Sequence, residues 1–236
     1  MGKPLELSIE KENEDAEDRS KKTSIRLIRV GDGIIEVARP WYDVNLTVKR
    51  WFQQRNHEKR RSPLVAGLSF FRGSENPNPC STTHYRSSNV ISGIALCLGG
   101  SHCLFIDNTY EHYRISAAIA LRDFLGDPRV TVVGVGMQKA AESLKKDWNI
   151  VLGKPVEVRT LMEAAYQKQE MPRKATLEDM AEIALDGMRT RRRAAHRQRE
   201  KGYGCLDEAQ ALETTFNSFL CFKIGVKCLQ KLGRPA

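Results

Sequence analysis

Several familiar signals are missing from this chain, and each absence excludes a class of protein. The six cysteines include no Cys-x-x-Cys pair and the histidines have no ligand-like spacing, so the sequence indicates neither a thiol redox motif nor a zinc site. No run of about 18 apolar residues occurs, as a membrane-spanning helix would need, and the first residues lack the apolar stretch of a secretory signal. We therefore expect an intracellular protein that does not associate with membranes.

Positive charge is in excess in this sequence. The 236 residues include 38 Lys and Arg against 29 Asp and Glu, which gives a net charge of +9. A field of this sign attracts polyanions, so RNA or single-stranded DNA is the expected partner. The alternative is that the charge only keeps the protein soluble. The length is that of one well-sized domain.

Acidic residues are concentrated at the N-terminus. Residues 1–22 contain seven of them, with only Leu5, Leu7 and Ile9 as large apolar side chains. Such a segment buries too little apolar surface to become ordered. We predict a disordered acidic tail over residues 1–22 and a single folded domain over residues 23–236.

Apolar patterning in the rest of the chain predicts alternating strands and helices. The predicted strands are residues 24–30, 34–37, 64–71, 90–98, 103–106 and 130–135, with a further short strand at Val156 and Val158. The predicted helices are residues 43–55, a segment lined by Ile119, Leu121, Phe124 and Leu125, one carrying Ala141, Leu144 and Trp148, one capped by Thr176 and Asp179, and a last long one from Asp207 to Leu229. Cys97, Cys103, Cys221 and Cys228 lie in apolar runs and are expected to be reduced and buried. The pattern indicates a mixed sheet with helices packed on it.

Four segments in this order resemble one protein family. They are Leu96-Cys97-Leu98-Gly99, Cys103-Leu104-Phe105-Ile106, residues 121–128 and Val133-Gly134-Val135-Gly136-Met137. They are similar to the plant Werner-syndrome-like 3′-to-5′ exonuclease domain, over residues 34–229 and most strongly over residues 65–161. The resemblance implies an α/β fold of the ribonuclease H-like, DnaQ-like (RNase D-like) exonuclease class, with a mixed central sheet flanked by helices.

The same resemblance implies two divalent metal ions held by four carboxylates, with a tyrosine that orients the attacking water. The family's first motif, Asp-x-Glu, falls on Ser69 and Phe71, and the aspartate of its second motif falls on Ala140. Its third motif, Tyr-x-x-x-Asp, falls on Glu213 and Asn217, which are four residues apart and share a helix face. We therefore expect an inactive or strongly impaired exonuclease that binds no cofactor and still binds nucleic acid.

The alternative is an active exonuclease with an altered site for Mg²⁺ or Mn²⁺. Glu213 is the weak candidate ligand of this altered site, together with the hydroxyl of Ser69, the amide of Asn217, and Glu142 or Glu157. A slip in the alignment would instead bring Glu75 or Asp107 into the site. Manganese accepts a poorer ligand set than magnesium, so it is the fairer test of this alternative.

Two basic clusters are the candidate contacts for a nucleic-acid backbone. They comprise Lys59, Arg60, Arg61, Arg189, Arg191, Arg192, Arg193, Arg197, Arg199 and Lys201. No aromatic residues alternate with the arginines, so base stacking is not indicated. A basic run is also typical of a nuclear-import signal or of an inert solvated surface, and it favours the nucleus slightly over the cytoplasm.

A further alternative is a protein that acts through assembly. An inactive copy of this fold could form homo-oligomers, or hetero-oligomers with active homologous exonucleases. Co-migration with a protein partner rather than with nucleic acid would distinguish this role.

Overall fold

A computed structural model describes residues 7–10, 23–30, 33–40, 48–49, 51–53, 64–72, 91–107, 119, 121–166, 174–185 and 208–234. Side chains are not described for residues 7–10, 23–40, 107, 208 and 209. The strands are β1 (Leu7–Glu10), β2 (Thr23–Val30), β3 (Gly33–Pro40), β4 (Leu64–Arg72), β5 (Ile91–Leu98), β6 (His102–Asp107), β7 (Val130–Gly134) and β8 (Lys154–Glu157). The helices are α3 (Met137–Trp148), α4 (Val158–Tyr166), α5 (Leu177–Ala184) and α6 (Glu208–Lys231).

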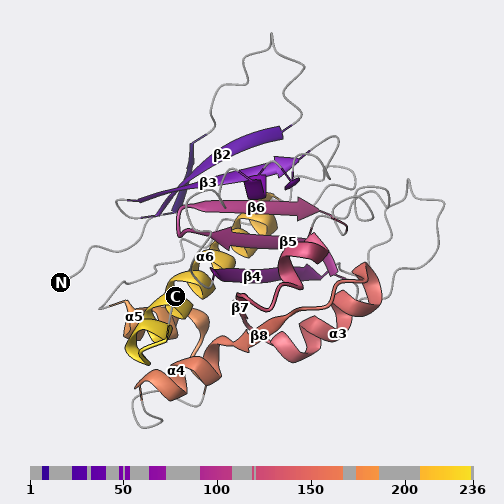
Figure 1. Cartoon of the computed structure of the whole chain (residues 1–236). Helices are drawn as coiled ribbons and strands as arrows, with labels where there is room; N and C mark the ends of the chain where they lie inside the picture. Colours follow the sequence, from indigo (N-terminus) through magenta and orange to yellow (C-terminus); the bar gives the residue numbers. More distant parts are fainter. Residues whose placement is uncertain are drawn as a thin grey trace.

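The strands form one mixed sheet, in the order β1-β2-β3-β6-β5-β4-β7-β8 (Figure 1). Neighbours β4, β7 and β8 are parallel, as are β3 and β6, and the remaining pairs are antiparallel. The carboxyl ends of β4, β7 and β8 therefore meet at one edge of the sheet, the usual place for a ligand in an open α/β sheet.

Alternate residues of β4 face two separate cores, because successive strand side chains point to opposite faces. Val65 packs into the core formed with α4, α5 and α6, whereas Ala66 and Leu68 pack into the core formed with α3 and the helical segments at residues 48–49, 51–53 and 121–125. Strand β4 is thus covered on both faces, which explains its nearly continuous apolar sequence.

Helix α6 lies directly on β4 at Gly67. A Cβ atom added to this glycine would lie 2.0 Å from the backbone oxygen of Ser218 and 2.6 Å from the backbone nitrogen of Phe222. Only a residue without a side chain permits this approach. Residue 67 therefore sets the position of the middle of α6 on the sheet.

Most of the predicted elements are confirmed. The strand predictions at residues 24–30, 34–37, 64–71, 90–98, 103–106 and 130–135 match β2 to β7, and the predicted capping box of α5 is present. Thr176 Oγ1 accepts from the backbone nitrogen of Asp179 at 3.2 Å, and the backbone nitrogen of Thr176 donates to Asp179 Oδ2 at 2.7 Å. The four cysteines expected in the core are free thiols and buried.

Three expectations differ from the structure. Val158 is the first residue of α4 rather than part of a strand, because it starts the helical spacing of Leu161, Met162 and Ala165, which are buried on one side of that helix. Ile119 is 45% exposed and does not line the core. Leu7–Glu10, within the segment predicted to be disordered, forms β1, because pairing with β2 supplies backbone hydrogen bonds that the isolated segment lacks.

Within the described part of the chain, no helix combines the length and the apolar character that crossing a membrane requires.

Candidate functional site

Ser69 and Phe71 lie near the carboxyl end of β4, on the face that carries α6. They follow Val65 and Gly67 at intervals of two residues, and Ser69 pairs with Ala95 while Phe71 pairs with Gly93. Both side chains are half-buried. The first two predicted site residues are therefore on one face, at the sheet edge where the parallel strands end.

Asn217 lies on α6 immediately before Ser218, the residue whose backbone contacts the glycine position of β4. Since Ser69 is two residues beyond Gly67 on the same face, the structure brings Asn217 to the same helix–strand interface as Ser69. The Oδ1 atom of Asn217 is buried and has no hydrogen-bond partner among the described residues. A buried carbonyl oxygen without a donor costs about 1–3 kcal/mol, so a donor or a cation from outside would be favourable here.

Glu213 lies one helical turn before Asn217 and is exposed to solvent. It is the single carboxylate among the five predicted positions. Its exposure allows it to stay hydrated, so its charge needs no compensation from a bound ion.

Ala140 lies in the first half of α3, a helix that packs on the opposite face of the sheet from α6. Its side chain is 2% exposed, and its backbone nitrogen donates to the oxygen of Gly136 at 3.0 Å. Gly136 has a φ of 66°, which lets the chain turn directly from β7 into α3. The second-motif position is therefore a buried methyl group rather than a carboxylate facing solvent.

Glu157 and Glu142, the acids considered for a rebuilt metal site, have different surroundings. Glu157 ends β8, and its Oε2 accepts from the backbone nitrogen of Met137 at 2.9 Å, at the positive N-terminal end of α3. Burial, and secondarily the nearby charge of Glu157, raise the pKa of Cys221 on α6 to about 12. Glu142 is exposed on α3. Glu157 thus already has a structural role, fastening the start of α3 to the end of β8.

Asp107 and Glu75, which a shifted alignment would bring into the site, add no described metal ligand to it. Asp107 pairs in register with Gly93, two strands from β4, and its side chain is outside the described part of the structure. Glu75 lies outside the described residues.

The residues at the five predicted positions do not fit a pair of divalent metal ions. Hard ions such as Mg²⁺ need anionic oxygen ligands, and neither a phenyl ring nor a methyl group has a donor atom. Ser69 and Asn217 offer neutral oxygens, which leaves Glu213 as the one charged donor. Over the described ranges, no group of three or more His, Cys, Asp or Glu side chains is placed to hold a metal ion.

The basic residues predicted to contact nucleic acid lie outside the described residues. These are Lys59, Arg60, Arg61, Arg189, Arg191, Arg192, Arg193, Arg197, Arg199 and Lys201. Their contact with nucleic acid stays a prediction.

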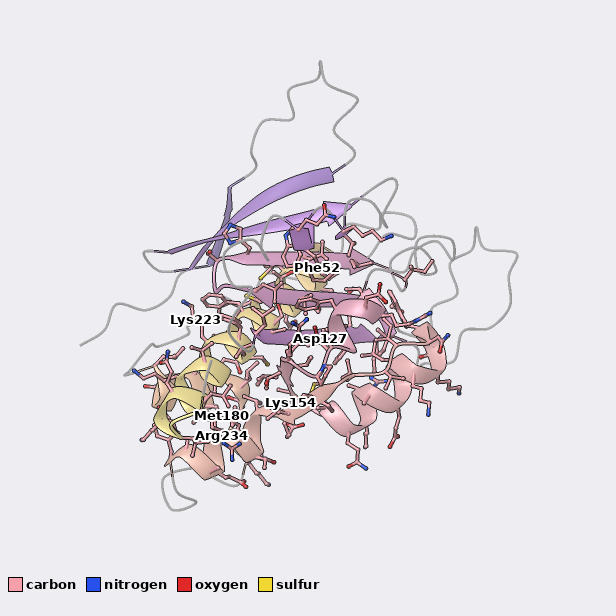
Figure 2. All side chains as sticks on the ribbon, viewed as in Figure 1. Phe52, Asp127, Lys154, Met180, Lys223 and Arg234 are labelled. Carbon is pink, nitrogen blue, oxygen red and sulfur yellow. The ribbon has the colours of Figure 1, made fainter. Side chains whose placement is uncertain are left out.

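Arg72 is a cation at this edge that sequence reasoning missed. It is the last residue of β4, and its Nη1 and Nη2 atoms donate to Ser143 Oγ on α3 at 3.3 and 3.4 Å. A basic residue directly after Phe71, at the carboxyl end of a predicted buried strand, was the available signal. By contrast, Lys223 lies at the other end of the sheet, near the β5–β6 turn at Gly100 and 5.6 Å from the ring centre of Phe219 (Figure 2).

Comparison with solved structures finds nuclease and polymerase domains. Escherichia coli RNase D, an exoribonuclease involved in structured RNA processing, is 14% identical with a TM-score of 0.53, over 79% of this chain and 43% of that protein. The exonuclease domain of EXD2 soaked in Mn and Mg is 16% identical with a TM-score of 0.38, over 78% of this chain and 84% of that one. The POL domain of Pol1 from M. smegmatis, in complex with DNA primer-template and dNTP, is 16% identical with a TM-score of 0.49, over 79% and 26% respectively.

These similarities concern the fold. No protein-family model matches the chain. No curated protein matches it either. The mixed sheet with helices on both faces and the likeness to RNase D show that the chain has the ribonuclease H-like, DnaQ-like exonuclease fold.

Proposed function

We propose that this chain is a Werner-like exonuclease domain of the plant type that has lost its catalytic carboxylates and binds RNA or single-stranded DNA without hydrolysing it efficiently. One observation carries the proposal: the edge where the fold is expected to hold metal ions presents Ser69, Phe71 and a buried Ala140. Hydrolysis in this family depends on two metal ions held by carboxylates. The residues found here do not fit such ions, so we assign no hydrolytic step to the site.

Loss of the carboxylates favours binding of a phosphate backbone. A cluster of four carboxylates repels phosphates unless metal ions neutralise it, whereas hydroxyl, phenyl, methyl and amide groups carry no charge. The whole chain has a net charge of +9, which attracts a polyanion. RNase D, whose fold this chain shares, is an exoribonuclease involved in structured RNA processing, which supports nucleic acid as the class of ligand.

Binding without metal is the first test. Fluorescence anisotropy of a labelled single-stranded oligonucleotide in EDTA should show an affinity that falls steeply between about 50 and 200 mM salt, because phosphate contacts release counterions. DNA and RNA of one sequence should be compared in parallel. Absence of binding, or binding that does not respond to salt, would contradict the proposal.

The second test is a nuclease assay on a 3′-labelled oligonucleotide with Mg²⁺ and with Mn²⁺. We expect no shortening by the natural chain. The matched positive control carries Ser69→Asp, Phe71→Glu, Ala140→Asp and Asn217→Asp together, which restores the carboxylates that the resemblance implies. Activity of this variant alone would show that the four positions form the former catalytic site.

A second candidate function is a weak exonuclease with an altered metal site. The observation that favours it is the buried Oδ1 of Asn217, which lacks a hydrogen-bond partner among the described residues and lies one turn from Glu213. A cation would supply the partner that the Asn217 oxygen lacks among the described residues. One-nucleotide ladders that appear with Mn²⁺ and vanish in Glu213→Ala would establish this function and disprove the inactive one.

A further inference from the structure

The side-chain oxygen of Asn217 is an acceptor without a donor. Its Oδ1 atom is buried and has no hydrogen-bond partner among the described residues. Trp51 Nε1 and Thr215 Oγ1 share this condition, but both of these residues belong to the buried interior. Asn217 as a whole is only half-buried. Its unsatisfied oxygen therefore lies close to the surface of the protein, where a group of a ligand can reach it.

Asn217 lies on α6 where this helix packs on β4. The backbone oxygen of the next residue, Ser218, lies against Gly67, and Ser69 follows Gly67 on the same face of the strand. The amide is thus attached to a helix that is held against the sheet by a close main-chain contact. Its position is set before a ligand arrives, and such preorganisation favours a specific contact.

The carboxamide of Asn217 can turn its oxygen toward a ligand. The torsion about its Cβ–Cγ bond has broad, roughly two-fold preferences, so a half turn exchanges the oxygen and the nitrogen. No hydrogen bond from a described residue holds the oxygen in place. Because an acceptor left without a donor is unfavourable, a donor supplied by a ligand stabilises the turned amide.

The backbone of RNA offers a donor that the backbone of DNA lacks. Phosphodiester oxygens only accept hydrogen bonds, and the deoxyribose within a DNA strand has no donor. The 2′-hydroxyl of RNA both donates and accepts, and it occurs on each nucleotide whatever its base. The N–H groups of bases also donate, but their pattern changes from base to base. A single acceptor that meets strands of any sequence therefore finds its donor in the ribose.

We propose that Asn217 accepts a hydrogen bond from a ribose 2′-hydroxyl, and that this contact makes the chain prefer RNA to DNA. The inference rests on the proposed function and names its substrate class. Residue 217 is the position where the resemblance implies an aspartate. An aspartate would accept the same hydrogen bond but would repel the phosphates on either side of the sugar, whereas the neutral amide does not.

Two variants of the full chain and three single-stranded oligonucleotides test this contact. Asn217→Leu removes the acceptor at similar volume, and Gln230→Leu makes the same kind of change at an exposed position near the C-terminal end of α6. The oligonucleotides have one sequence, as RNA, as DNA and as RNA with fluorine in place of each 2′-hydroxyl. The fluorine removes the donor but keeps the sugar conformation of RNA.

Affinities are measured by fluorescence anisotropy in EDTA, so that no divalent cation competes for the oxygen of Asn217. Thermal melting first shows which variants are folded. If Asn217→Leu does not fold, Asn217→Ala takes its place, because it removes the same acceptor and adds no bulk.

The natural chain should bind RNA about three- to tenfold more tightly than fluorinated RNA or DNA, which is the effect of one hydrogen bond. In Asn217→Leu the affinity for RNA should fall to that for fluorinated RNA, whereas Gln230→Leu should keep the difference. Equal binding of the two RNAs by the natural chain, or a difference that persists in Asn217→Leu or vanishes in Gln230→Leu, would overturn the role of Asn217 while the proposed function stands. Failure of the natural chain to bind any of the three would instead disprove the proposed function.

Discussion

At the scale of single residues, Gly67 leaves the least room for a side chain among the described glycines. The backbone of Ser218 occupies the space that a Cβ atom would need, so strand and helix touch through their main chains. This contact brings the part of α6 that contains Asn217 onto β4. The site geometry therefore depends on a residue that has no side chain of its own.

Gly67→Ala should lower the free energy of unfolding by about 3 kcal/mol, because the added methyl group forces α6 away from β4. The control is Gly99→Ala. Gly99 has a φ of 66° and nothing within 4 Å of an added Cβ, so its substitution costs only the backbone strain of about 1 kcal/mol. Urea unfolding measures the loss of unfolding free energy in both variants. Equal losses would show that α6 packs on β4 less tightly than the structure indicates.

Cys221 is a buried thiol whose ionisation depends on folding. Burial, followed by the charge of Glu157, raises its pKa from 9.0 to about 12. A thiol that stays neutral in the folded state stabilises the protein fully below pH 9, where the unfolded thiol is neutral too. As the pH rises from 9 toward 12, the unfolded state releases its proton first, and stability is lost.

The difference in unfolding free energy between the natural chain and Cys221→Ala should therefore shrink above pH 9, by about 1 kcal/mol at pH 10. The comparison of the two proteins cancels the titration of other groups. Urea unfolding at pH 7, 8, 9 and 10 measures it. A difference that stays constant over this range would mean that water reaches the thiol in the folded state.

At the scale of elements, α3 is tied to the sheet at both ends. Its first backbone nitrogen donates to Glu157 Oε2 at 2.9 Å, and Nε1 of Trp148 donates to the backbone oxygen of Ile91 at 3.4 Å. These bonds connect α3 with β8 and with β5. The position of Ser143 relative to Arg72 follows from this attachment.

Glu157→Ala should lower the unfolding free energy by about 1 kcal/mol. The first backbone amide of α3, at the positive end of the helix dipole, loses its carboxylate acceptor. Glu157→Gln keeps an acceptor oxygen and should cost less. Neither change should alter nucleic-acid affinity by much, because Glu157 is engaged with the backbone nitrogen of Met137. A large loss of binding in Glu157→Gln, measured by anisotropy in EDTA, would assign this residue to the ligand site instead.

At the scale of the whole molecule, the predicted site residues come from elements on both faces of the sheet. Ser69 and Asn217 lie on the side of the sheet that carries α6, whereas Ala140 and Ser143 belong to α3, which packs on the opposite face. An aspartate at position 140 would replace a methyl group that is 2% exposed, whereas carboxylates at positions 69, 71 and 217 would lie on the side of the sheet that carries α6. Burial of the first charge and repulsion among the others would lower the stability of the fold.

The fourfold variant that carries Ser69→Asp, Phe71→Glu, Ala140→Asp and Asn217→Asp should thus be less stable than the natural chain in EDTA, by more than about 2 kcal/mol, and should regain stability with Mn²⁺. The natural chain should show no shift of melting temperature with Mn²⁺. Thermal melting with and without the ion measures both. A fourfold variant as stable as the natural chain in EDTA would show that these positions do not form one site.

The sequence predicted the local elements well because their signals are short-range. The strand patterns and the capping box of Thr176 each involve residues within a few positions of one another. The prediction of a short strand at Val156 and Val158 was wrong at Val158, which begins α4. The sequence also failed to predict β1, whose order depends on pairing with a strand that follows more than ten residues later.

By itself, the sequence determined the chemistry available at the site, because a phenyl ring at position 71 and a methyl group at position 140 lack metal-binding atoms wherever they lie. Only the tertiary structure decided which groups meet there. It showed that Glu157 caps α3, and that Arg72 reaches Ser143, 71 residues away in the sequence. Both contacts join α3 to strands of the sheet, β8 and β4, and they form only when that helix packs on the sheet, which no local pattern of residues encodes.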